Sequence, residues 1–299
     1  MTTSASCGGA GRFAPSPSGD LHLGSLRTAL LAWLFARSSD RRFLLRIEDL
    51  DRVRPGAMER QIGDLAAIGL DWDGEVARQS ERTDFYVDAV RRLEDADLTY
   101  ECFCTRREIR EAASAPHGIP GAYAGTCRDL TDAERTRRRA ERPAAIRLRS
   151  DVTEFSVLDL LHGDYTGPVD DVVLVRNDGV PAYNLAVVVD DADQGVDQVV
   201  RGDDLLASAP RQAYIASLLG LPVPTYAHVP LAVNARGERL AKRDGSVTLD
   251  DLAREGITVR QVLAMLGSSL GFAGDSPKAM LGEFDPARLP RAPWTATDR

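Results

Sequence analysis

The chain has little that would hold it in a membrane or direct it out of the cell. No run of about 18 apolar residues occurs in it, which excludes a membrane-spanning helix. Its N-terminus, Met-Thr-Thr-Ser-Ala-Ser-Cys-Gly-Gly-Ala, has neither the basic part nor the apolar part of a signal peptide. We therefore expect a cytoplasmic protein without a membrane partner.

Cysteine is scarce, and the few copies are unevenly spaced. Of the four cysteines, Cys102, Cys104 and Cys127 are grouped, whereas Cys7 stands alone near the N-terminus. This spacing does not match the disulfide framework of a small secreted domain. Basic residues are outnumbered by acidic ones, and the net charge of −8 argues against indiscriminate coating of nucleic acid. A local basic surface can still bind RNA phosphates.

Apolar residues, in contrast, are sufficient for a large core, since 43% of the chain is hydrophobic. The first 100 residues alternate between apolar strands and helices. The second strand is expected over 42–49, and the helices after it over 56–68 and 81–95. Ser80 is the expected cap of the second helix. This alternation predicts an α/β fold with a doubly wound parallel sheet, in which ligands gather at the carboxyl ends of the strands.

Residues 101–170 interrupt the alternation with the grouped cysteines, a Gly- and Pro-rich loop and a basic helix, which indicates an inserted subdomain. Alternation then resumes with a helix over 205–219 and apolar strands over 172–175, 185–189 and 228–233. We therefore expect a disordered tail over 1–11 and a main domain in two halves, 12–100 and 171–249, with the insertion over 101–170 between them. A helical C-terminal region over 250–299 follows.

Residues 12–25, Arg-Phe-Ala-Pro-Ser-Pro-Ser-Gly-Asp-Leu-His-Leu-Gly-Ser, join a strand to a helix through a turn stiffened by proline. Gly19 and Gly24 let the backbone come close to a ligand. The helix begins near Gly24, and its first amide groups and its dipole form an anion site that His22 can complete. The stretch therefore predicts a phosphate-binding turn.

This stretch resembles the "HIGH" signature of the class I aminoacyl-tRNA synthetases, here as His-Leu-Gly-Ser, and its lead-in resembles the glutamate-specific branch. Ser25 replaces the last histidine of the signature, a departure that the glutamyl enzymes tolerate. The resemblance implies a Rossmann-type catalytic domain in which His22, Gly24 and Ser25 bind ATP and His22 is catalytic.

Residues 238–245, Glu-Arg-Leu-Ala-Lys-Arg-Asp-Gly, resemble the second class I signature, the "KMSKS" loop. An isolated Lys-Arg-Asp-Gly is typical of a solvated turn, but this one follows a buried strand far beyond the first signature. The resemblance implies that Lys242 is catalytic and that Lys242 and Arg239 bind ATP, because a flexible cation can follow charge as it moves onto pyrophosphate. Ala241 replaces a serine, so one phosphate contact is lost or supplied by the backbone.

Amino-acid selection needs a carboxylate for the ammonium group and cations for the carboxylates, and the predicted strand ends supply both. Glu48 is the candidate for the ammonium group. Arg12 and Arg201 are the candidates for carboxylates, because a guanidinium binds a carboxylate with two parallel hydrogen bonds. The resemblance to the glutamyl branch implies a glutamate pocket built from Arg12, Ala14, Ser16, Glu48, Tyr183 and Arg201.

The pattern Cys102-x-Cys104 followed by Tyr123-Ala-Gly-Thr-Cys127 resembles the zinc site in the insertion of glutamyl-type enzymes. Three thiolates and one oxygen or nitrogen ligand satisfy tetrahedral zinc. The resemblance implies one structural Zn²⁺ with Tyr123 as fourth ligand, and His117 is the alternative because imidazole is a commoner ligand.

A cluster of carboxylates, Asp190, Asp191 and Asp193, also suits hard cations. We favour a structural role for the cluster, because the family binds Mg²⁺ mainly through ATP.

The resemblance covers residues 12–245, and the helical domains with which glutamyl-tRNA synthetases read the anticodon have no counterpart in it. This shortened pattern resembles the glutamyl-Q tRNA(Asp) synthetases. It implies activation of glutamate by ATP with Mg²⁺ and without tRNA, then transfer of glutamate to queuosine in the anticodon loop of tRNA(Asp). The alternatives are a catalytic fragment or paralogue that charges the tRNA 3′ end and a non-catalytic tRNA-binding paralogue. A monomer is the default expectation.

Overall fold

The computed structural model describes residues 8–113, 123–234, 237 and 247–295. Its main sheet has seven strands, and its pairs are parallel except for the last, β6 with β7. In spatial order the strands are β3 (Ala77–Arg78), β2 (Arg42–Ile47), β1 (Ala10–Phe13), β9 (Val196–Gly202), β10 (Thr225–Val229), β6 (Glu154–Asp159) and β7 (Gly163–Pro168).

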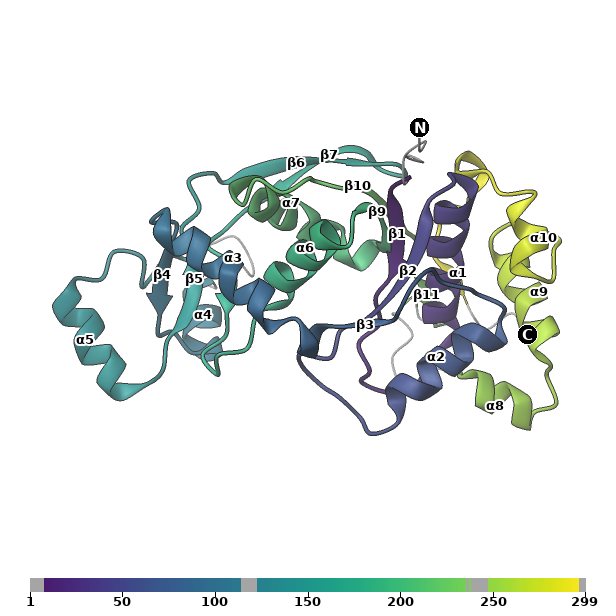
Figure 1. Ribbon diagram of the computed structural model, residues 1–299, viewed down its shortest axis with the longest axis horizontal. Coiled ribbons are helices and arrows are strands. Elements are labelled where there is room, and N and C mark those ends of the chain that lie inside the picture. The colour runs from purple at the N-terminus through teal and green to yellow at the C-terminus, as the bar shows by residue number, and fades with distance from the viewer. Residues whose placement is uncertain (1–7, 114–122, 235–236, 238–246, 296–299) are drawn as a thin grey trace, which may run out of the picture.

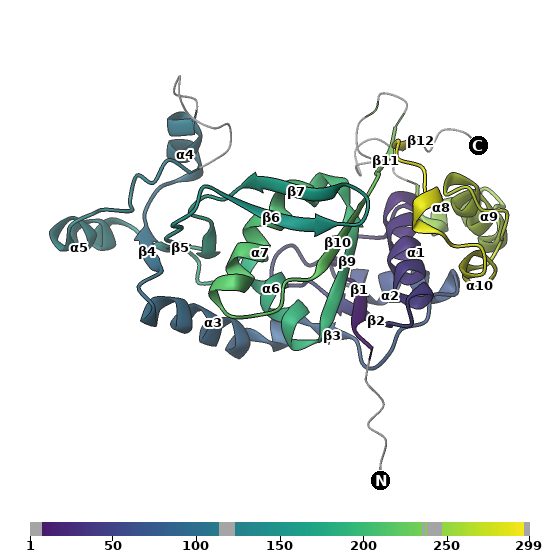
Figure 2. The same cartoon turned by 90° about the horizontal axis from the view of Figure 1, so that it is seen from above.

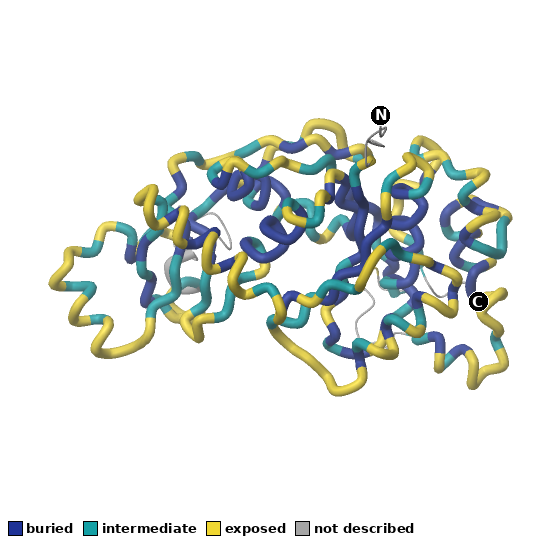
Figure 3. Tube along the Cα trace, in the orientation of Figure 1, coloured by how far each residue is buried: buried dark blue, intermediate teal, exposed yellow. Residues whose placement is uncertain are grey.

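Helices cover both sides of this sheet. Figure 1 shows α1 (Leu23–Ser38) on one side of the central strands and α6 (Tyr183–Asp193) and α7 (Ala209–Leu218) on the other. The buried part of the chain follows these helices and strands (Figure 3), because apolar residues of β1, β2, β9 and β10 face helices on both sides. The predicted fold class, an α/β doubly wound sheet, is therefore confirmed.

Two further helices pack against those that cover the sheet. Helices α2 (Ala57–Ala67) and α3 (Thr83–Asp95) fall where the sequence predicts them. Ser80 does not cap α3, which is preceded by Arg82; the Ser80 amide and hydroxyl donate instead to the carboxylate of Asp49 at 2.8 and 2.6 Å. The predicted cap is therefore wrong, because Asp49 offers Ser80 a charged acceptor.

A second, antiparallel sheet holds β4 (Thr99–Cys102), β5 (Ala145–Leu148) and β8 (Val173–Val175). With α4 (Arg106–Ala113) and α5 (Asp132–Glu141) it lies at the end of the molecule away from the C-terminal helices (Figure 2). The hairpin β6–β7 falls inside the range 101–170 expected for the insertion, yet β6 pairs with β10 of the main sheet. Strand β8, predicted in the second half of the main sheet, belongs to the small one.

The sequence predicts a strand over 185–189, and this prediction is wrong, because those residues lie in α6. The run Leu-Ala-Val-Val-Val is rich in β-branched residues, which favours a strand. In the structure α6 is buried from Leu185 to Asp191, and a helix buried all round shows no amphipathic period by which to recognise it.

The described residues near both ends of the chain pack into the core. Strand β1 begins at Ala10, inside the predicted tail, while residues 1–7 lie outside the described residues. In the C-terminal region α8 (Leu249–Arg254), α9 (Val259–Ser269) and α10 (Pro277–Leu281) join the core cluster of α1. Beyond them β12 (Trp294–Thr295) pairs with β11 (Ala232–Val233). In the described parts of the chain no helix has the length and apolar character needed to cross a membrane.

Candidate active site

A cavity of about 700 Å³ opens beyond the carboxyl ends of β1, β2 and β9. This is the edge at which ligands bind in open parallel sheets. The structure brings nine of the predicted ATP and glutamate residues to its wall: Arg12, Ala14, Ser16, His22, Gly24, Ser25, Glu48, Tyr183 and Arg201. The two remaining candidates, Arg239 and Lys242, lie outside the described residues.

His22 caps the N-terminus of α1. Its Nδ1 accepts a hydrogen bond from the backbone amide of Ser25 at 3.1 Å, and its Nε2 lies 3.1 Å from Ser25 Oγ. A Cβ at Gly24 would approach the His22 ring to 3.1 Å and the Cβ of Ala232 to 3.0 Å, so a larger residue would require these neighbours to shift by a few tenths of an ångström. The geometry puts an imidazole and the positive end of a helix dipole at one wall of the cavity.

The chain just after the second signature returns to the first. Leu23 N donates to Val247 O at 3.1 Å, and Thr248 forms an antiparallel bridge with His22. Val247 and Thr248, which follow the second motif in sequence, therefore lie beside the N-terminus of α1.

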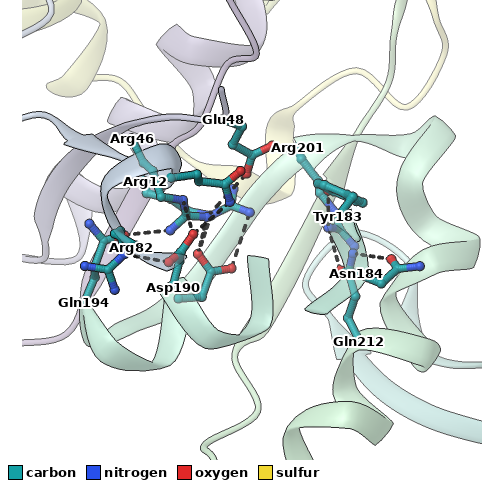
Figure 4. Close-up of polar contacts among 12 residues, drawn as sticks. Arg12, Arg46, Glu48, Arg82, Tyr183, Asn184, Asp190, Gln194, Arg201 and Gln212 are labelled. Carbon is teal, nitrogen blue, oxygen red and sulfur yellow. Dashed lines mark hydrogen bonds and ion pairs between the residues drawn. The ribbon is translucent and has the colours of Figure 1, made fainter. Parts of the chain in front are cut away.

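Two buried carboxylates on α6 organise the arginines behind the cavity (Figure 4). Asp191 accepts from Arg12 Nε at 3.2 Å and lies 2.8 Å from an Arg46 terminal nitrogen. Asp190 accepts from Arg82 Nε at 2.7 Å and from the Tyr86 hydroxyl at 3.0 Å. These carboxylates are held by arginines and by the Tyr86 hydroxyl, which accords with a structural role rather than a metal site.

Glu48 follows β2 and lies at the edge of this cluster, with its carboxylate 3.5 Å from Arg46. Its side chain is 10% exposed, and its amide donates to Pro15 O at 3.0 Å, which ties it to the first motif. Burial raises the pKa of Glu48, and the charges of Arg46 and Arg12 oppose that rise. A buried carboxylate whose ionised form is only partly compensated is stabilised by an additional cation such as an ammonium group.

Arg201 on β9 occupies another part of the wall. It donates to Gln212 Oε1 at 2.8 Å and to the hydroxyl of half-exposed Tyr183 at 3.3 Å (Figure 4). On its other side Arg201 Nε lies 3.0 Å from Nε2 of His228, whose Nδ1 lies 2.6 Å from Asp159.

Sequence reasoning missed Arg46, Gln212, His228 and Asp159, which support the pocket from behind. One signal was present in the sequence, namely a single histidine inside the apolar run of β10.

The predicted metal ligands meet at the end of β4 in the small sheet. Sulfur atoms of Cys102, Cys104 and Cys127 all lie within 4.8 Å of one another, and within the described residues this is the one group of His, Cys, Asp and Glu side chains that could hold a metal ion. The Tyr123 hydroxyl lies 3.3 Å from Cys102 Sγ and 3.7 Å from Cys104 Sγ. Three thiols and one hydroxyl converging on one point fit a tetrahedral ion. His117, the alternative ligand, lies outside the described residues.

Residues 10–279 match the family described as class I tRNA synthetases (E and Q), catalytic domain. The glutamyl-Q tRNA(Asp) synthetase of Nocardia farcinica is 70% identical over 292 residues, which cover 97% of this chain and 94% of that protein. The chain belongs to the glutamyl-Q tRNA(Asp) synthetase family. The protein of the same name from Cutibacterium acnes is 57% identical and aligns with 88% of this chain and 76% of its own length.

A crystal structure of a glutamate tRNA ligase from Elizabethkingia meningosepticum, in complex with its amino acid, superposes with a TM-score of 0.80 at 29% identity. The match covers 96% of this chain and 66% of that ligase, so this member of the glutamyl-Q tRNA(Asp) synthetase family spans just under two thirds of the ligase's length. The class I synthetase fold that the two signatures imply is confirmed, and the chain is a class I synthetase-type ligase.

Proposed function

We propose that this chain activates glutamate with ATP and then transfers the glutamyl group to queuosine in tRNA(Asp). The proposal is supported by one cavity that is lined by a buried carboxylate, two guanidinium groups and a histidine-capped helix end. The names of the relatives at 70% and 57% identity supply the acceptor.

In the first step a carboxylate oxygen of glutamate attacks the α-phosphorus of Mg²⁺-bound ATP, and pyrophosphate leaves. Glu48 binds the substrate ammonium group, and Arg12 and Arg201 bind its carboxylates, with Tyr183, Ala14 and Ser16 around them. Preorganised donors of this kind favour the reacting geometry because they need no reorientation during reaction.

Phosphate stabilisation falls to the α1 end of the cavity. His22 and the helix start at Gly24 and Ser25 face the triphosphate, and Lys242 with Arg239 takes the charge that develops on pyrophosphate. These groups accelerate the step by stabilising the charge that develops in the transition state, and they transfer no protons. In the second step a hydroxyl of queuosine attacks the activated carbonyl, and AMP leaves.

The insertion holds a structural Zn²⁺ in this proposal. Cys102, Cys104 and Cys127 supply thiolates, and Tyr123 supplies the fourth ligand. Bound zinc would cross-link β4 to the segment that precedes α5, which the small sheet does not join by strand pairing.

The test is glutamate-dependent exchange between ATP and pyrophosphate by zinc-loaded protein without tRNA. Exchange is expected with glutamate, and its absence overturns the proposal. The second step is assayed with tRNA(Asp) carrying queuosine, tRNA(Asp) lacking it and tRNA(Glu). Labelling of tRNA(Glu) would favour 3′ end charging, and tRNA binding without exchange would favour a non-catalytic paralogue. The proposal includes a cytoplasmic location and a monomeric state. Size-exclusion chromatography with light scattering measures the oligomeric state.

A further inference from the structure

Three neighbouring strands of the main sheet end in a buried chain of polar side chains. Arg201 on β9 stands opposite His228 on β10 in the register of the two strands, and Asp159 ends β6 on the other side of β10. Arg201, His228 and Asp159 are 5%, 0% and 1% exposed. Polar groups so deeply buried must satisfy one another, so their contacts define where each proton lies.

The proton positions follow from the partners. A guanidinium group only donates, so Nε2 of His228 accepts from Arg201 Nε at 3.0 Å and carries no proton. The proton is therefore on Nδ1, which donates to the carboxylate of Asp159 at 2.6 Å. Asp159 is itself fixed, because the amides of Leu161 and His162 donate to its other oxygen at 2.8 and 3.0 Å. The ring is a neutral bridge held in one tautomer.

This bridge fixes the plane of the Arg201 side chain. The guanidinium group lies 5.4 Å from the ring centre of Tyr226, and the Tyr226 ring in turn stacks with the His228 ring at 5.6 Å and 18°. Gln212 and Tyr183 accept from one terminal nitrogen at 2.8 and 3.3 Å, and the backbone oxygen of Leu205 accepts from the other at 3.4 Å. Without the acceptor at His228 Nε2, the Nε edge would lose its hydrogen bond, and the guanidinium group could pivot about its terminal nitrogens.

We propose that His228, oriented by Asp159, is a positioning residue that sets the angle at which Arg201 presents its guanidinium group to a substrate carboxylate. The inference rests on the proposed function, because it takes Arg201 as part of the glutamate pocket. Four of the five N–H groups of Arg201 donate to His228, Gln212, Tyr183 and the backbone oxygen of Leu205, so the guanidinium presents its remaining N–H and its charge to the carboxylate. The side chain of glutamine carries no charge, so the same device favours glutamate over glutamine.

Two substitutions separate the acceptor from the donor of the ring. In His228→Gln the side-chain amide reaches the position of Nε2, where its oxygen can accept from Arg201. In His228→Asn it reaches only the position of Nδ1, where it can donate to Asp159 but leaves Arg201 Nε without an acceptor. Both variants and the wild type are assayed for KM and kcat in exchange, with glutamate and with glutamine, and for Tm.

We expect His228→Asn to raise KM for glutamate about tenfold or more, the factor that corresponds to about 1.4 kcal/mol, with kcat within about twofold. Its preference for glutamate over glutamine should fall, whereas His228→Gln should keep KM within about threefold of the wild type. Equal rises of KM in both variants, or a fall of kcat at unchanged KM, would overturn the proposal. If His228→Asn does not fold, a tenfold rise of KM in His228→Gln overturns it. Loss of exchange in the wild type would instead refute the proposed function.

Discussion

Replacing Asp191 with asparagine should destabilise the protein far more than removal of a surface ion pair. Asp191 is 6% exposed, and its carboxylate faces Arg12 at 3.2 Å and Arg46 at 2.8 Å. Burial raises the pKa of Asp191, but the charges of Arg12 and Arg46 and their hydrogen bonds outweigh it and hold this pKa below its usual range. Asparagine keeps the shape but removes the charge, and its amide nitrogen would face two guanidinium groups.

The size of the effect follows from burial. Removing one partner of a buried ion pair costs about 3–5 kcal/mol, because the charge that remains is uncompensated. At about 2.1 cal/mol/K of unfolding entropy per residue, a chain of 299 residues loses about 1.6 °C of Tm per kcal/mol. Asp191→Asn should therefore lower Tm by about 5–8 °C.

Thermal unfolding followed by circular dichroism measures this shift. The matched control is Asp88→Asn, which removes a pair with Arg91 whose side chains are 52% and 68% exposed. Such a pair contributes less than about 1 kcal/mol, so Tm should fall by less than about 2 °C. A Tm for Asp191→Asn within about 2 °C of the wild type would refute the reasoning. The pKa of Asp191 is lower in the folded state than in the unfolded state. The ionised carboxylate therefore stabilises the fold at pH values above the unfolded-state pKa, and this contribution is lost as pH falls through the folded-state pKa. The difference in Tm between the wild type and Asp191→Asn should therefore become smaller in acid.

Three further predictions concern the active site and the metal. Glu48→Gln should raise KM for glutamate about tenfold, because the ammonium group pairs with the ionised form of Glu48. Burial raises the pKa of Glu48, so the wild-type KM should rise as pH falls through that pKa, whereas the KM of the variant should not change with pH. A KM of the variant that depends on pH in the same way would contradict this reasoning. Cys104→Ser should lose bound zinc in metal analysis while Cys7→Ser keeps it, and equal zinc in both would count against the site. Lys242→Ala should depress exchange but leave glutamate binding, measured by calorimetry, nearly intact. The control is Lys278→Ala, because Lys278 is exposed on α10. Loss of glutamate binding together with exchange in Lys242→Ala would indicate misfolding.

The sequence by itself determined the fold class and the pocket's main residues. Both signatures are local, because a proline-stiffened turn before a helix and a lysine loop after a strand depend on residues close together in the chain. Parallel strands place their carboxyl ends at one edge, so Glu48 after β2 and Arg201 on β9 could be expected to meet without coordinates. The resemblance to the zinc site of glutamyl-type enzymes likewise indicated one cluster of Cys102, Cys104, Tyr123 and Cys127.

Only the tertiary structure decided what stands behind those residues. Whether residues 185–189 form a strand or a helix depends on burial from several sides, and that burial turns Asp190 and Asp191 toward Arg46, Arg82 and Arg12. The hairpin β6–β7 looks like part of the insertion in sequence, yet it adds to the main sheet and places Asp159 next to β10. The chain from Arg201 to His228 to Asp159 exists because three strands from distant parts of the sequence lie side by side, which no local pattern encodes.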